Sequence, residues 1–166
     1  MNASIERSQY LTFFVAGEEY AIPILRVREI LEHSRVTRVP STPPYIRGVI
    51  NLRGSVIPVI DLAVKFGLEP AAISKTSCIV VVELSGSEQT IMGVIADSVR
   101  QVVDFAQNEI EAAPSFGVHG RVDFLLGMGL MADAFVLMLD IDKALSTTEI
   151  LAALDARDEA PEEATA

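Results

Sequence analysis

The stretch that decides the fold runs Ile46-Arg-Gly-Val-Ile-Asn-Leu-Arg-Gly-Ser-Val-Ile-Pro-Val-Ile-Asp-Leu62, and a variant of it returns later in the chain. The segment 124–141 aligns with 45–62 without a gap, 79 residues further on. In each copy two apolar runs flank a short bend, which is typical of a β-hairpin. A repeat of this length predicts one supersecondary unit used twice, and therefore two similar subdomains. The matched positions include Gly48 with Gly127, Asp61 with Asp140, and Arg47 with Leu126.

Short apolar runs separated by Gly and Pro turns make up the rest of the chain. These runs predict strands at 10–16, 20–24, 46–52, 55–60, 78–84, 89–96 and 99–103. Apolar residues at helical spacing predict short helices at 25–33 and 62–66, and a capping box at Ser146 to Glu149 predicts a third at 146–154. So many short strands favour small barrels over an open parallel sheet.

The predicted organisation is one domain at 9–154 between two polar ends. Residues 1–8 are expected to be a flexible N-terminus, and 155–166 a disordered acidic tail, since five acids and small residues cannot bury a core. Pro70 to Thr76 is the only plausible internal boundary. A first barrel is therefore expected at about 9–70 and a second at about 77–145, with the chain ends free to cross over.

Composition narrows the class of protein. Half of the 166 residues are hydrophobic, yet the longest apolar run, 124–139, is broken by Asp133 and is too short for a membrane span. There is no secretory leader, and Cys78 is a single cysteine, so a cytoplasmic protein is expected. The surplus apolar residues then belong in the core or on a partner-facing surface. Six arginines lie in 26–53, but a net charge of −10 favours an acidic protein partner over nucleic acid.

No constellation of residues predicts catalysis, and we predict neither cofactor nor metal. The spelling Gly127-Met-Gly-Leu-Met-Ala132 matches a dinucleotide-binding pattern, but a strand follows it where the mechanism needs a helix, so it predicts hairpin glycines. The residues His33, His119 and Cys78 lack metal-ligand spacing. Asp140 and Asp142 are predicted to be solvated carboxylates on one strand face rather than an acid–base pair.

With the repeat and its motifs in hand, the chain resembles the CheW family of bacterial chemotaxis coupling proteins from about Ser8 to Leu154. The resemblance is carried by Gly17-Glu-Glu-Tyr-Ala-Ile-Pro-Ile24, Val27-Arg-Glu-Ile30, Tyr45-Ile-Arg-Gly-Val-Ile-Asn-Leu-Arg-Gly54, Pro58-Val-Ile-Asp-Leu62 and Pro114-Ser-Phe116. It implies a mainly β fold of two five-stranded barrels sharing an apolar interface. It also implies a non-enzymatic adapter, monomeric when isolated, that joins chemoreceptor cytoplasmic tips to the regulatory domain of a histidine autokinase within a membrane receptor array.

The resemblance assigns residues to two partner sites. The receptor-facing groove carries over to Ile24, Val27, Glu29, Gly48, Arg53 and Gly93. For Ile24 and Val27 the alternative role is ordinary core packing. For Arg53 the alternative is a solvated turn residue, whereas in the groove its fork of hydrogen-bond donors could orient Glu29 or a receptor side chain. The kinase-binding side carries over to Phe116, Ser115 and Glu111, where Glu111 and Ser115 depart from the basic and acidic residues expected in the family.

Two other functions compete with the coupling protein. One is a regulatory domain detached from a chemotaxis kinase, which shares the fold. The other is a small ligand-binding β-barrel, which would need a pocket lined by convergent polar groups.

Overall fold

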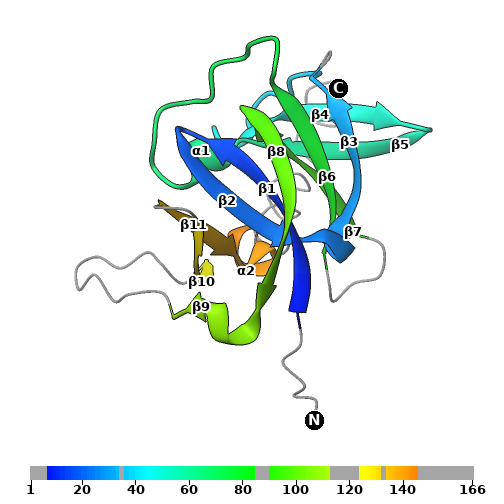
Figure 1. The fold of residues 1–166 in the computed structure, drawn as a ribbon. Helices are drawn as coiled ribbons and strands as arrows, with labels where there is room; N and C mark the ends of the chain where they lie inside the picture. Colours follow the sequence, from blue (N-terminus) through cyan, green and yellow to red (C-terminus); the bar gives the residue numbers. More distant parts are fainter. Residues whose placement is uncertain (1–6, 34–35, 85–89, 113–123, 132–133, 146–166) are drawn as a thin grey trace, which may run out of the picture.

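The computed structural model describes residues 7–33, 36–84, 90–112, 124–131 and 134–145, and these form two β-sheets (Figure 1). The six-stranded sheet has the order β8 (Ser98–Ala106), β1 (Arg7–Val15), β2 (Glu18–Pro23), β11 (Ala134–Leu139), β10 (Leu125–Met131) and β9 (Ile110–Glu111). The five-stranded sheet has the order β3 (Val27–Glu32), β6 (Cys78–Leu84), β7 (Thr90–Ala96), β5 (Ser55–Ile60) and β4 (Ile46–Leu52). Short helical turns join them: η1 (Ile24–Arg26), α1 (Leu62–Lys65), η2 (Gln107–Glu109) and α2 (Ile141–Ala144). The predicted mainly β fold is confirmed.

The internal repeat is confirmed in three dimensions. Each copy is a hairpin followed by a one-turn helix: β4, β5 and α1 in the first copy, and β10, β11 and α2 in the second. Each first strand carries a register irregularity just before its glycine, at Gly48 and at Gly127. Each second strand pairs in parallel with a strand of the opening hairpins, β5 with β7 and β11 with β2. The gapless alignment therefore matches positions that play the same part in the fold.

The sheets do not follow the two halves of the chain. β1 and β2 pair with the late strands β8 and β11, while β3, β4 and β5 join β6 and β7 in the other sheet. The expected boundary at 70–76 thus does not coincide with the division between the sheets, and the chain ends cross over, as the prediction allowed. The opening hairpin and the final hairpin meet through the parallel contact of Tyr20 with Leu137, a pairing of residues far apart in the chain that no local pattern encodes.

The predicted helix at 25–33 is wrong. Only Ile24–Arg26 is helical, and it is a single 3-10 turn, after which the chain becomes β3 and pairs antiparallel with β6. The six residues of β3 alternate half-buried and exposed, the pattern of a strand with one covered face. Pairing with β6, in which every residue except Glu83 is buried, outweighs the helical spacing of a few apolar residues. The predicted helix at 146–154, the predicted tail at 155–166 and residues 1–6 lie outside the described residues. Arg7 and Ser8, which the prediction placed in the flexible N-terminus, belong to β1, where they pair with β8.

The core lies between the sheets and inside each of them. β6 is buried on both faces: Val80 and Val82 belong to the central cluster, whereas Ile79 and Val81 face a second cluster within the five-stranded sheet. The central cluster draws residues from both sheets, so the sheets share one apolar interface. At about 25 cal/mol per Å² of apolar surface buried, this interface is the main force holding the sheets together.

Candidate functional site

The tip of the first hairpin is built to present Arg53. Arg53 and Gly54 have φ angles of 52° and 88°, so both central residues of this two-residue turn lie in the left-handed region, as a type I′ turn requires. The Asn51 side-chain oxygen accepts a hydrogen bond of 2.9 Å from the Gly54 amide and holds the turn. Arg53 is thereby 72% exposed, and its guanidinium donates to Glu29 at 2.8 Å and 3.3 Å.

This ion pair joins the two edge strands of the five-stranded sheet. Glu29 lies on β3 and Arg53 ends the β4 side of the hairpin, at opposite ends of the strand order. Just beyond β3, Thr37 exchanges backbone hydrogen bonds of 2.9 Å and 2.8 Å with Val49 of β4. The sheet therefore curls until its edges meet, and the Glu29–Arg53 pair lies where they meet, with the Glu29 side chain 25% exposed.

The two predicted groove glycines are explained inside the fold. A Cβ on Gly48 would lie 2.1 Å from the Thr37 carbonyl oxygen, so Gly48 permits the contact between the sheet edges. A Cβ on Gly93 would lie 2.7 Å from a methyl carbon of Ile79. Both glycines are buried, so each acts on a partner only through the shape of the sheet.

The predicted apolar residues of the groove are half-buried. Ile24 and Val27 both pack against the central core cluster and keep part of their surface accessible. Ile24, Val27 and Glu29 follow one another along η1 and β3, and the ion pair brings Arg53 to Glu29. Only Glu29 and Arg53 among these offer polar groups to a partner.

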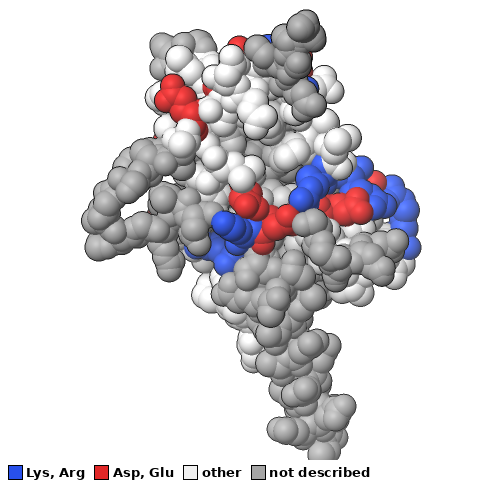
Figure 2. Space-filling view, turned by 90° about the horizontal axis from the view of Figure 1, so that it is seen from below, with Lys and Arg blue, Asp and Glu red and all other residues white. Residues whose placement is uncertain are grey.

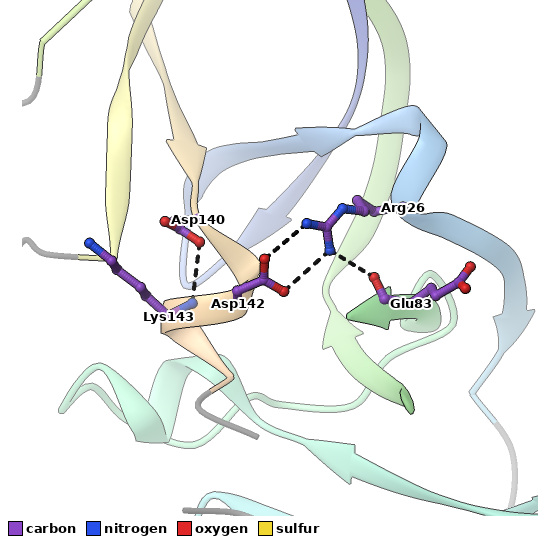
Figure 3. Close-up of polar contacts among 5 residues, drawn as sticks. All are labelled: Arg26, Glu83, Asp140, Asp142 and Lys143. Atoms are coloured by element: carbon purple, nitrogen blue, oxygen red, sulfur yellow. Dashed lines mark hydrogen bonds and ion pairs between the residues drawn. The ribbon is translucent and has the colours of Figure 1, made fainter. Parts of the chain in front are cut away.

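A second polar cluster joins η1 to α2, and sequence reasoning missed it (Figure 3). The Arg26 guanidinium bonds both carboxylate oxygens of Asp142, at 3.2 Å and 2.9 Å, and donates to the Glu83 carbonyl at 3.0 Å. The bond to Asp142 raises the pKa of Arg26 above its usual value. The predicted strand placement of Asp140 and Asp142 is wrong, since Asp140 caps α2 and Asp142 lies within it. A separation of 116 residues leaves no sequence signal for this pairing.

The hairpin copies also differ in the aspartate that ends them. The Asp61 side chain is fully buried and accepts from the amides of Ala63 and Ala71, each at 3.0 Å, and from Arg47 at 2.6 Å. Asp140 accepts a bond of 3.2 Å from the Lys143 amide, and Leu126 stands where the first copy has Arg47. The first copy therefore carries a buried polar anchor at the end of β5 that lies away from the Arg53 turn.

The kinase-binding prediction is only partly within the described residues. Glu111 is exposed in β9 and pairs with Met128 of β10, whereas Ser115 and Phe116 lie outside the described residues. Glu111 lines an open hollow of about 620 Å³ whose walls include acidic Asp104 and Glu109 and apolar Leu130.

The dinucleotide-like glycines are hairpin glycines, as predicted. A Cβ on Gly129 would lie 2.6 Å from the Phe105 ring, and one on Gly127 would lie 2.5 Å from the Glu111 carbonyl oxygen. The strand β10 that holds them leads into β11 rather than into a helix. A pyrophosphate would find no helix N-terminus here.

The charged side chains on the face seen in Figure 2 form a band of alternating sign. Acidic side chains that alternate with basic ones do not form the continuous positively charged surface that nucleic acids bind. Among the residues that the structure describes, no group of three His, Cys, Asp or Glu side chains is placed to hold a metal ion. In the same part of the chain no helix has the length and apolarity to cross a membrane.

A family of known proteins matches most of this chain. The model of the CheW-like domain matches residues 9–149. The chain belongs to the CheW-like family. It is 35% identical over 142 residues to the chemotaxis protein CheW of Klebsiella aerogenes, covering 86% of this chain and 84% of that protein. It is 39% identical over 124 residues to the chemotaxis protein CheW of Bacillus subtilis, covering 74% and 77%.

A solved structure supports the same assignment. The crystal structure of the scaffolding protein TtCheW from Thermoanaerobacter tengcongensis superposes with a TM-score of 0.72 at 34% identity, covering 81% of this chain and 89% of that one. These similarities favour a chemotaxis scaffold over a ligand-binding barrel or a detached kinase domain.

Proposed function

We propose that this chain couples chemoreceptor signalling tips to the regulatory domain of the chemotaxis histidine kinase, without chemistry of its own. Family membership supports a scaffold, and one observation supports the placing of its receptor side: the exposed Glu29–Arg53 pair at the meeting edges of the five-stranded sheet. In this role the protein is recruited from the cytoplasm to membrane receptor arrays. It needs no cofactor, since its work is to hold two proteins together.

The receptor side joins an apolar floor to a polar rim. Ile24 and Val27 leave part of their apolar surface open, and Glu29 and Arg53 supply one acid and one base beside it. A receptor tip built from helices would lay an apolar face on this floor, with the rim setting its orientation. Gly48 and Gly93 keep the sheet in the shape that the floor requires.

The kinase side is assigned to Glu111 and to the following Ser115 and Phe116. The hollow beside Glu111 combines apolar Leu130 with the exposed acids Asp104 and Glu111. Arg7 lines the same hollow and pairs with Glu109 at 3.4 Å. Asp104 and Glu111 then complement a basic side chain of the kinase that lies next to an apolar one.

The test is a pair of titrations on the variant Arg53→Ala, one against the receptor tip and one against the kinase regulatory domain. Loss of a charge-assisted contact is expected to weaken receptor binding roughly tenfold and to leave kinase binding unchanged. Arg100→Ala is the matched control, because Arg100 is an exposed arginine paired with Glu19 on the six-stranded sheet. Equal losses for both partners would show that Arg53 supports the fold, and no loss in either would remove it from the receptor site.

A further inference from the structure

The η1 turn is the point where the chain passes from one sheet to the other. β2, which precedes it, belongs to the six-stranded sheet, and β3, which follows it, belongs to the five-stranded sheet. The turn is only three residues long, and its closing bond runs from the Val27 amide to the Ile24 carbonyl. Among the described residues no side chain caps it. Something else must therefore hold this crossover in place.

Arg26 is anchored to both sheets at once. Its bidentate bond reaches Asp142 in α2, which directly follows β11 of the six-stranded sheet. Its third bond reaches the Glu83 carbonyl in β6 of the five-stranded sheet. The Arg26 and Asp142 side chains are 29% and 36% exposed, so solvent screens their ion pair only in part. The neighbouring Leu25, by contrast, is 89% exposed.

We propose that the Arg26–Asp142 pair is a strut that positions η1, and with it Ile24 and Val27, for receptor binding. This inference deepens the proposed function and rests on its receptor side. Arg26 is a positioning residue here: its side chain points to Asp142 and Glu83, while its backbone neighbours form the receptor-facing floor.

The chemistry of the strut requires arginine and a carboxylate. A guanidinium presents a planar fork that meets both carboxylate oxygens while another N–H reaches the Glu83 carbonyl, whereas a lysine ammonium is one compact charge. The first hairpin copy lacks this device, since Ala63 occupies the position that matches Asp142. The strut thus belongs to one copy alone, where it faces the crossover.

The experiment is a double-mutant cycle with Arg26→Gln, Asp142→Asn and the two together. Each variant is titrated with receptor tip and with kinase regulatory domain, and backbone amide exchange is followed at residues 24–27. We expect each single substitution to weaken receptor binding roughly five- to tenfold. The double variant should bind the receptor tip no more weakly than the single variant with the lower affinity. Kinase binding should stay within about twofold, and exchange at 24–27 should quicken. Arg26→Lys should recover only part of the lost receptor affinity.

Arg100→Gln is the control, because it removes another ion-paired arginine, one that contacts Glu19 at 3.1 Å on the six-stranded sheet, away from η1 and from the hollow beside Glu111. Receptor affinity within about twofold of wild type for both single variants, or additive losses in the double, would overturn the strut. So would parallel losses of kinase binding and melting temperature, which would give Arg26 a purely structural role. Wild-type protein that bound kinase but no receptor tip would overturn the proposed function, and this inference with it.

Discussion

The two copies of the hairpin contain an internal control for the worth of a buried carboxylate. Asp61 and Asp140 occupy matched positions and both cap a one-turn helix. Replacing Asp61 by Ala should destabilise the protein far more than the same change at Asp140. The reason lies in what each carboxylate holds beyond its cap.

The magnitude follows from the bonds of each side chain. At Asp61 one oxygen caps α1 through the amides of Ala63 and Val64, which is worth about 1 kcal/mol. The other oxygen accepts from the Ala71 amide and from Arg47, each worth about 1 kcal/mol once the partial exposure of Arg47 is allowed for. Asp61→Ala should therefore lose about 3 kcal/mol, and Asp140→Ala about 0.5–1 kcal/mol.

Urea unfolding of the full chain, followed by circular dichroism, measures both losses. In a thermal melt of the same protein, Asp61→Ala should lower Tm by roughly 6–12 °C, because 1 kcal/mol shifts Tm by about 2–4 °C in a chain of this size. Asp61→Asn adds a sharper test, because its amide would keep the cap but turn a donor toward two other donors, Arg47 and the Ala71 amide. It should lose about 2 kcal/mol. Equal losses at Asp61 and Asp140, or a neutral Asp61→Asn, would refute the reasoning.

Two further results are expected. Gly48→Ala should destabilise the fold by about 2–4 kcal/mol, because its Cβ would lie 2.1 Å from the Thr37 carbonyl oxygen at a φ of 150°. Gly17→Ala also meets a positive φ, of 84°, but has open space around its Cβ and should lose only about 1 kcal/mol. Similar urea midpoints for the two variants would contradict this. Burial raises the pKa of the Cys78 thiol and, with help from Glu18, that of Tyr20. The folded protein then keeps protons on Cys78 and Tyr20 at pH values where the unfolded chain has released them. The free energy of unfolding should therefore fall as the pH rises above 9.0, where the unfolded Cys78 loses its proton, and again above 10.0, where Tyr20 does. A urea midpoint that rises across this pH range would contradict the prediction.

Much of the candidate site was open to prediction because it is local. The bend at Arg53 and Gly54 depends on residues close in the chain, and the hairpin assignment of Gly127 and Gly129 rested on the strand that follows them. Pattern and turn chemistry therefore predicted them. The Glu29–Arg53 contact was predicted only as one alternative, because family resemblance, not spacing, placed the two side chains together.

The helix expected at 25–33 failed for the opposite reason. Its apolar spacing was compatible with a helix, but the backbone of the largely buried strand β6 needs hydrogen-bond partners along this edge, and β3 supplies them. A short segment takes the conformation that satisfies its neighbours in space, whatever its own weak preference. The same non-local pairing brought Arg26 to Asp142 and placed β1 and β2 in a sheet with the last strands.

By itself, the sequence determined the mainly β class, the doubled hairpin with its turns, and the resemblance to a coupling protein. These depend on side-chain alternation, on glycine at left-handed positions and on bonds a few residues long. Only the tertiary structure decided which strands share a sheet, how the edges of the five-stranded sheet meet and which charges join across that meeting. Those outcomes depend on burying two apolar faces of β6 and on contacts between residues as far apart as Arg26 and Asp142, for which neighbours in the chain carry no information.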